Sequence, residues 1–182
     1  MANDFLKDFT IRAGAALEAE DRLIIGSGHI RGEVGGILRL NNERYYQFIL
    51  WKAVLSSWNA KVEEQSHDLV IFDPSNSDKA LAIFEMKKWM SPNGLPELPG
   101  ILHDIKRLNA CDAPNAALII FSANNRGEMD KQLEWFEEHV FAGIPKPQRE
   151  TYCFPTVSPH TPAAEFWIAV WPIKSGPLFS RQ

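Results

Sequence analysis

The sequence predicts an α/β protein with a central mixed β-sheet flanked by helices. Short runs of aliphatic and aromatic residues, which are typical of buried strands, alternate along the chain with longer segments of helical periodicity. The order of these segments is helix, three strands, helix, strand, helix, strand, and such a mixed order favours a sheet covered by helices. The chain has 182 residues, the length of one ordinary domain, so we assign residues 1–182 to a single domain.

Composition narrows the functional classes. A hydrophobic content of 45% and a charged content of 23% are typical of globular proteins and exclude a disordered, collagenous or coiled-coil chain. The net charge of −4 argues against an overall basic surface for nucleic acid, although it leaves room for a local basic groove. The two cysteines form no CxxC, which argues against a disulfide framework or a cysteine zinc site.

The apolar runs are shorter than the about 20 residues that a membrane span needs, and the N-terminus has no apolar signal region. We therefore expect a cytoplasmic protein without a membrane partner.

Two helices are expected before the first strand. Spaced apolar positions predict a helix over residues 4–24. The glycine-rich stretch that follows matches neither GxGxxG nor a P-loop, so it predicts a loop. Asn41 or Asn42 can cap a second helix that runs to about Trp58 and is apolar on most sides, as a buried helix is.

Three segments with strand character come next, weak at residues 61–65 and strong at 68–73 and 80–88. The turn-forming residues between the last two segments predict a hairpin. A helix, a strand, a helix and a last strand are then expected at residues 100–110, 116–121, 128–140 and 166–171. The proline-rich residues 142–163 are expected to form a loop.

The hairpin brings charged residues together. We centre its turn between Asn76 and Ser77. This centre places Asp68 opposite Glu85, so that the two side chains share one face of the sheet. Lys87 lies two residues beyond Glu85, and the period of two in a strand places it on that face as well. Both faces of the hairpin are otherwise apolar, so the pattern specifies this register weakly.

Two carboxylates placed opposite each other destabilise a sheet unless a positive charge neutralises them. Lys87 supplies one positive charge, and a divalent cation would supply more. Hard oxygen ligands suit magnesium, with manganese as a substitute. Glu43, in the first turn of the helix before the hairpin, offers a third acidic group.

This pattern resembles the restriction-endonuclease-like, or PD-(D/E)XK, nuclease superfamily. The resemblance rests on Asp68 at the start of an aliphatic strand, on Glu85-Met86-Lys87 in the next strand, and on the order of elements over residues 41–122. It implies a restriction-endonuclease-like core of helix, three strands, helix and strand, with an N-terminal helix and a C-terminal helix and strand as additions. His67, rather than proline, precedes Asp68.

The resemblance implies metal-dependent hydrolysis of DNA phosphodiester bonds. Asp68 and Glu85 would bind the metal, and Lys87 would orient or activate the attacking water and offset charge on the scissile phosphate. Glu43 would act as an outer ligand or support. The choice of DNA over RNA rests on the resemblance alone, and a homodimer would allow both strands to be cut.

Five further side chains are considered for weak nucleic-acid contacts: Arg31, Arg39, Lys106, Arg107 and Trp89. The two arginines near the glycine-rich stretch would approach the phosphate backbone, and Lys106 and Arg107 would contact phosphates from their helix. Trp89 would stack on a base. A solvated helix face for Lys106 and Arg107, and core packing for Trp89, are the simpler explanations. A partner protein that supplies DNA affinity would account for the acidic net charge.

Two alternatives remain open. A non-catalytic module that binds protein or nucleic acid on the same fold would make Glu85 and Lys87 an ordinary ion pair. A different metal-dependent hydrolase on this fold would use the same side chains on another substrate.

Overall fold

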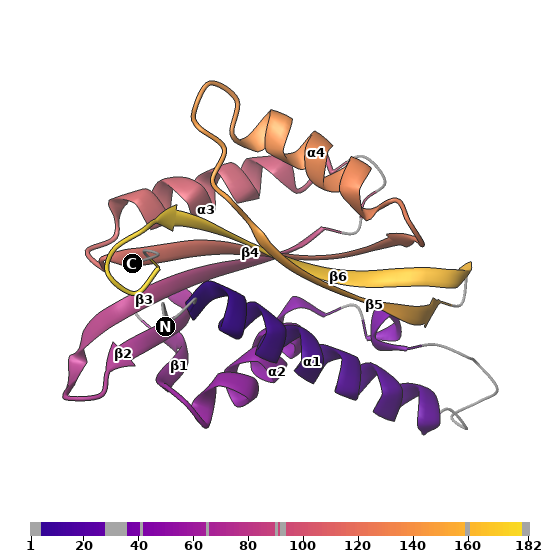
Figure 1. The fold of residues 1–182 in the computed structure, drawn as a ribbon, viewed down its shortest axis with the longest axis horizontal. Coiled ribbons are helices and arrows are strands. Elements are labelled where there is room, and N and C mark those ends of the chain that lie inside the picture. Colours follow the sequence, from indigo (N-terminus) through magenta and orange to yellow (C-terminus); the bar gives the residue numbers. More distant parts are fainter. Residues whose placement is uncertain are drawn as a thin grey trace.

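A computed structural model describes residues 5–27, 36–40, 42–64, 66–89, 91, 94–158 and 161–179. It is an α/β structure in which helices cover both faces of a six-stranded mixed sheet (Figure 1). The strands are β1 (Asn59–Glu64), β2 (His67–Asp73), β3 (Asn76–Trp89), β4 (Asn115–Asn125), β5 (Glu150–Ser158) and β6 (Thr161–Lys174). The helices are α1 (Phe5–Gly26), the short 3-10 helix η1 (Ile37–Arg39), α2 (Glu43–Leu55), α3 (Leu98–Ala110) and α4 (Met129–Val140).

The strands lie in the order β1-β2-β3-β4-β6-β5. The first three strands form an antiparallel meander, whereas β3 and β4 run parallel because α3 carries the chain back across the sheet. Strand β6 pairs antiparallel with both β4 and β5. The predicted mixed sheet with flanking helices is therefore confirmed, and Asn42 caps α2 by accepting a hydrogen bond from the N–H group of Arg44.

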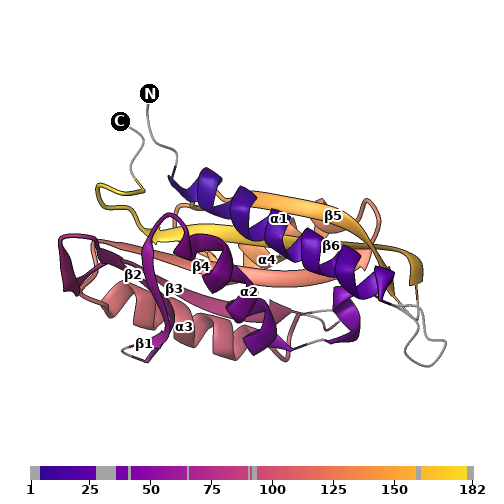
Figure 2. The ribbon, with the colours of Figure 1, turned by 90° about the horizontal axis from the view of Figure 1, so that it is seen from below.

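The sheet separates two apolar cores, one on each face. Alternate residues of a strand point to opposite faces. Leu69 and Ile71 accordingly pack with α1 and α2, while Val70 and Ile83 pack with α3 and α4. Figure 2 shows α1 crossing β5 and β6 on one side of the sheet. None of the described helices combines the length and apolar character that a membrane-spanning helix needs.

The hairpin register matches the prediction at one end and differs at the other. The predicted centre between Asn76 and Ser77 is wrong, because Asp73 pairs with Asn76 across a tighter turn. Register shifts on either side of Phe72 then add residues to β3. Leu69, Val70 and Ile71 pair with Phe84, Ile83 and Ala82 as predicted, so the hairpin is in the expected register next to the acidic residues.

The prediction of a loop over residues 142–163 is wrong, because this segment contains strand β5. This strand lies at the edge of the sheet, where one side of the backbone has no strand to pair with. Proline lacks an N–H group and is tolerated on such edges. Pro155 therefore fits within β5, opposite Glu165 of β6.

Candidate active site

Strand β3 has 14 residues and β2 has 7, so β3 pairs with β2 over only part of its length. We call residues 86–89 of β3, on the side of β2, the free edge. There the N–H group of Met86 donates a hydrogen bond to Oδ2 of Asp68 at 2.6 Å. The N–H group of Lys88 donates to Oε2 of Glu43, also at 2.6 Å. Two carboxylates thus take the place that a neighbouring strand would occupy.

Asp68 and Glu85 meet beside this free edge, as the sequence predicts. Their side chains come within hydrogen-bonding reach of each other. Gln47, which is buried on α2, donates a hydrogen bond from Nε2 to the carbonyl oxygen of Asp68 at 2.6 Å. The same Nε2 lies 3.4 Å from Oδ1 of Asp68. Gln47 therefore holds the start of β2 against α2 and orients the Asp68 carboxylate.

Glu85 is almost fully buried, with 3% of its side chain exposed. Its Oε1 lies 2.5 Å from Nδ1 of His67 and 3.2 Å from a terminal nitrogen of Arg107. Arg107 also donates a hydrogen bond to the carbonyl oxygen of Ser66. Burial, and then the neighbouring Asp68 carboxylate, raise the pKa of Glu85 to about 8, although Arg107 opposes this shift. Burial and the positive charge of Arg107 lower the pKa of His67.

Lys87 lies between carboxylates from two helices. Its Nζ is 3.2 Å from Oδ2 of Asp104 on α3 and 3.9 Å from Oε1 of Glu43 on α2. Burial of the ammonium group acts to lower the pKa of Lys87, but the nearby Glu43 and Asp104 carboxylates outweigh it, and the pKa is raised. Lys87 is therefore a fixed positive charge at neutral pH.

The cluster has more acidic than basic groups. Lys87 and Arg107 are its two permanent cations. Its four carboxylates belong to Glu43, Asp68, Glu85 and Asp104. Burial, as the largest cause, raises the pKa of three of these, namely Glu43, Asp68 and Glu85. A group of carboxylates with raised pKa values releases this unfavourable energy either by taking up protons or by binding a cation.

The residues that could hold a metal ion are Asp68 and Glu85. Within the described parts of the chain, no group of three or more His, Cys, Asp or Glu side chains is arranged to hold a metal ion. Asp68 and Glu85 form a pair of adjacent carboxylates. Magnesium is commonly held by one or two carboxylates and keeps several of its water molecules. Both carboxylates are desolvated, which is the condition that a bound divalent cation would relieve.

Asp104, Gln47 and His67 belong to the cluster although the sequence analysis assigned none of them to it. The side chain of Asp104 is only 7% exposed, so it lies on the buried side of α3. A signal was present, because Asp104 falls within the apolar stripe of α3 formed by Ile101 and Ile105. An acidic residue at a core-facing helix position requires a partner, which Lys87 supplies.

Two of the residues considered for nucleic-acid contacts have other roles. The prediction that Trp89 stacks on a base is wrong. Trp89 is 1% exposed and packs against Phe136 and Trp167 in the core, so a base cannot reach its ring. The side chain of Arg107 is only partly exposed, and its guanidinium group lies 3.2 Å from the carboxylate of Glu85. The helix-face explanation is thus wrong for Arg107.

For the other three residues of this group, contact with nucleic acid stays a prediction. Lys106 is exposed on α3. Arg39 lies on η1, which packs against α1 and β5 rather than on the elements that carry the carboxylates. Arg31 lies outside the described residues.

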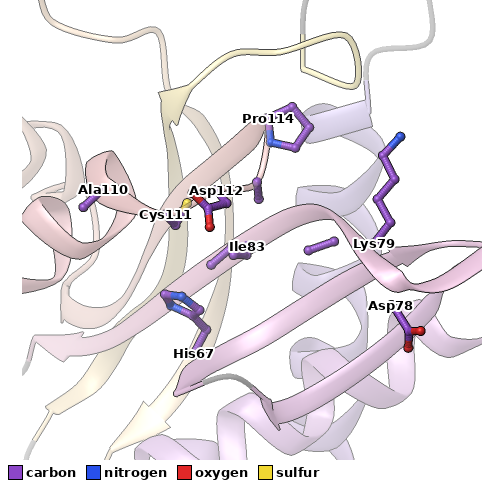
Figure 3. A pocket seen from close by; sticks show the side chains of 10 residues that line it. His67, Asp78, Lys79, Ile83, Ala110, Cys111, Asp112 and Pro114 are labelled. Atoms are coloured by element: carbon purple, nitrogen blue, oxygen red, sulfur yellow. The ribbon is translucent and has the colours of Figure 1, made fainter.

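A pocket of about 520 Å³ opens beside the cluster, between the β2–β3 hairpin and the connection from α3 to β4 (Figure 3). His67 is one of its walls, and Cys111 and Asp112 line the side formed by the α3–β4 connection. His67 therefore separates this pocket from the buried Glu85. Cys111 and Cys153 are both free cysteines.

Comparisons of this chain with protein-family models, with curated proteins and with solved structures find no match. The case for a function therefore rests on the residues and geometry of the cluster at the free edge of β3.

Proposed function

We propose that this protein is a metal-dependent nuclease that hydrolyses DNA phosphodiester bonds at the free edge of β3. The observation that carries the proposal is the convergence of Asp68, Glu85 and Lys87, two carboxylates and an ammonium group, beside an edge of the sheet. The resemblance to the PD-(D/E)XK superfamily rests on these same three positions. A restriction-endonuclease-like core over residues 41–122 is part of the proposal.

Asp68 and Glu85 would hold a magnesium ion, or manganese in its place. When bound, such an ion polarises a phosphoryl oxygen and makes hydroxide available near neutral pH. Lys87 remains an ammonium group at that pH, because its carboxylate neighbours raise its pKa. Its role is therefore to orient water and to offset charge on the phosphate, not to accept a proton.

Glu43 and Asp104 act as positioning residues for Lys87. They contact the ammonium group from α2 and α3, on opposite sides of the sheet. Glu43 also binds the N–H group of Lys88, so one carboxylate fixes both the backbone and the side chain at this end of β3. This arrangement holds the ammonium group beside the two carboxylates, as electrostatic catalysis requires.

DNA as the substrate, a homodimer that cuts both strands, and a partner protein that adds affinity are all expectations that follow from the resemblance and from the charge of −4. A nuclease with this charge would bind duplex weakly by itself, because affinity for the phosphate backbone comes mainly from Lys and Arg side chains.

One observation favours the alternative of a non-catalytic binding module. Arg107 and His67 both contact Oε1 of Glu85, so this carboxylate already has a cationic neighbour without a metal ion. In such a module, Glu85 would be a structural ion pair, and its replacement would leave binding of the partner unchanged.

Cleavage of supercoiled plasmid in magnesium or manganese tests the proposal. We expect cleavage by the wild-type chain and a loss of about 100- to 1,000-fold in Lys87→Ala, because the variant lacks the charge that offsets the phosphate. Glu85→Gln should lose activity to a similar or greater extent. Lys79→Ala is the matched control, since this exposed lysine lies on the same strand near the hairpin turn and should keep full activity.

Circular dichroism and urea unfolding establish that each variant is folded. Lack of metal-dependent cleavage of plasmid, single strands and duplex oligonucleotides by the folded wild-type chain would overturn the nuclease proposal. Equal activity of wild type and Lys87→Ala would exclude this site. Metal-dependent hydrolysis of a nucleotide or sugar phosphate, without DNA cleavage, would instead identify the different hydrolase.

A further inference from the structure

A groove of about 350 Å³ lies beside the candidate active site, between α2 and β1. Its walls are Arg44, Gln47 and Phe48 of α2 and Val62 and Glu63 of β1. Gln47 connects the groove to the site, because its side chain donates a hydrogen bond to the backbone of Asp68. A chain that leaves the two site carboxylates along α2 would therefore enter this groove.

Phe48 is an exposed aromatic side chain on the wall of this groove. It is 47% exposed, and it is the one aromatic residue among the large hydrophobic side chains that are exposed in the described parts of the chain. Its ring lies 5.5 Å from the ring of Trp51, centroid to centroid, at a tilt of 39°. An exposed ring beside a groove is the usual stacking platform for an unpaired base.

Two cations flank this ring on the same helix. Arg44 precedes Phe48 by four residues and Lys52 follows it by four, so the three side chains share one side of α2. Nζ of Lys52 lies 5.6 Å from the centroid of the Phe48 ring. The Arg44 side chain is 83% exposed, and Glu63, which lies 3.9 Å away, holds it only weakly because water screens such a pair.

We propose that the strip formed by Arg44, Phe48 and Lys52 binds unpaired nucleotides next to the phosphate that is cleaved. A base stacks on Phe48, and the flanking phosphates pair with Arg44 and Lys52. In a duplex both faces of a base are covered by its neighbours, so this contact selects single-stranded nucleic acid, such as an end, a flap or a splayed junction. The inference rests on the proposed function for its position beside the cleaved bond.

The strip also accounts for binding by an acidic protein. A few basic side chains close together can bind the phosphate backbone even when the whole protein is acidic. Aromatic side chains add affinity that does not depend on net charge. Because every base has a face that can stack, the strip binds DNA and RNA single strands by the same chemistry. DNA and RNA oligonucleotides are therefore separate arms of the test.

Fluorescence anisotropy of labelled oligonucleotides in EDTA measures binding without cleavage. The probes are a single-stranded DNA, an RNA of the same sequence, and the corresponding DNA duplex. We expect Phe48→Ala to weaken binding of a single strand by about 5- to 100-fold and to leave duplex binding unchanged. Phe48→Trp should restore the affinity. Arg44→Ala should weaken binding and reduce the salt slope by about 0.7.

Ile11→Ala is the matched control, because Ile11 is 46% exposed, close to the value for Phe48, and lies on α1 rather than on the strip. This variant should bind like the wild type. Urea unfolding of each variant shows whether it is folded, and the exposure of Phe48 predicts only a small change in stability.

Equal affinity of folded Phe48→Ala and wild type for both single strands would overturn the inference, and so would wild-type binding without preference for single strands over duplex. These results are distinct from failure of the proposed function. A chain that cleaves DNA but shows no dependence on Phe48 contradicts only the inference. A chain that binds single strands through Phe48 and cleaves no nucleic acid contradicts only the nuclease proposal.

Discussion

Two glutamates of this protein, Glu137 and Glu85, are buried next to an arginine, and they differ in what surrounds the pair. Oε1 of Glu137 on α4 lies 2.5 Å from a guanidinium nitrogen of Arg149 and accepts a hydrogen bond of 3.1 Å from the indole of Trp171. Arg149 also lies 4.0 Å from Asp130, but that side chain is 78% exposed and water screens the pair. The buried carboxylate of Glu137 thus has one close cation and one further donor. Such a closed arrangement stabilises a fold without a ligand.

Glu85 belongs to the opposite kind of arrangement. It also contacts an arginine, Arg107, but the Asp68 carboxylate lies against it, and both acids have raised pKa values because they are buried. Four carboxylates share two permanent cations in this cluster. The contrast indicates that burial of an ion pair does not by itself mark a candidate site, whereas an excess of one charge within a buried cluster does.

The largest stability effect should come from the balanced pair. Arg149→Ala leaves the Glu137 carboxylate buried without its cation and should lower the free energy of unfolding by about 3 kcal/mol. Urea unfolding measures this value. Arg126→Ala, at an exposed arginine, is the control and should change it by no more than about 0.5 kcal/mol. If the two substitutions had equal effects, the Glu137–Arg149 pair would not stabilise the fold, and its contrast with the cluster around Glu85 would fail.

The second effect is a pH dependence of stability that comes from the candidate active-site cluster. The pKa of Glu85 is raised to about 8 in the folded chain from an ordinary value of 4.5, so the folded state holds this proton over a range where the unfolded state has lost it. Without metal, stability should therefore fall as the pH rises from about 5 to 8, at about 1 kcal/mol per pH unit.

Urea unfolding in EDTA at a series of pH values measures this slope. Glu85→Gln removes the titrating group and should flatten the curve between pH 5 and 8. A wild-type curve that is flat or rises over this range contradicts the assignment of a raised pKa to Glu85.

A smaller effect should come from added magnesium. The ion would bind the folded chain through Asp68 and Glu85, and at about ten times its dissociation constant it should raise the free energy of unfolding by about 1.4 kcal/mol. Thermal unfolding with and without magnesium detects this change. Asp68→Asn should abolish it, whereas Arg149→Ala should keep it, because that substitution lies in the balanced pair.

The smallest effect concerns the metal-free chain. Asp68→Asn removes one of the excess negative charges, and the oxygen of asparagine can still accept the N–H group of Met86. We expect this variant to be more stable than the wild type by about 1 kcal/mol in EDTA above pH 8, although it loses activity. Urea unfolding measures the difference. A destabilised Asp68→Asn would mean that the carboxylate serves the fold rather than a ligand.

The fold and half of the cluster could be predicted from the sequence because both follow from short-range periodicity. The period of two in β2 and β3 is enough to bring Asp68, Glu85 and Lys87 to one place once a hairpin is assumed. The exact turn was not needed, since the register shifts near Phe72 restore the alignment at the acidic end. Asp104 could not be assigned to the cluster from the sequence because its partner, Lys87, lies on another element of the fold.

The remaining errors have related causes. Strand β5 was not predicted because prolines usually interrupt strands, and only the position of a strand within the sheet reveals that it lies at an edge. Trp89 was considered for base stacking because it lies two residues from Lys87. The packing of α4 against the sheet, which buries the ring, depends on contacts across the chain.

Strand β2 begins only at His67, which leaves the N–H groups of Met86 and Lys88 on β3 without a partner strand. His67 pairs with Glu64 across a two-residue connection, so the β1–β2 hairpin closes just short of the free edge. If β1 and β2 were each two residues longer at this connection, the backbone of β2 would pair with Met86 and Lys88. The carboxylates of Asp68 and Glu43 would then be displaced from these two N–H groups. A small insertion at this connection would then cover the free edge and remove both carboxylates of the proposed site from it, with the strand order unchanged.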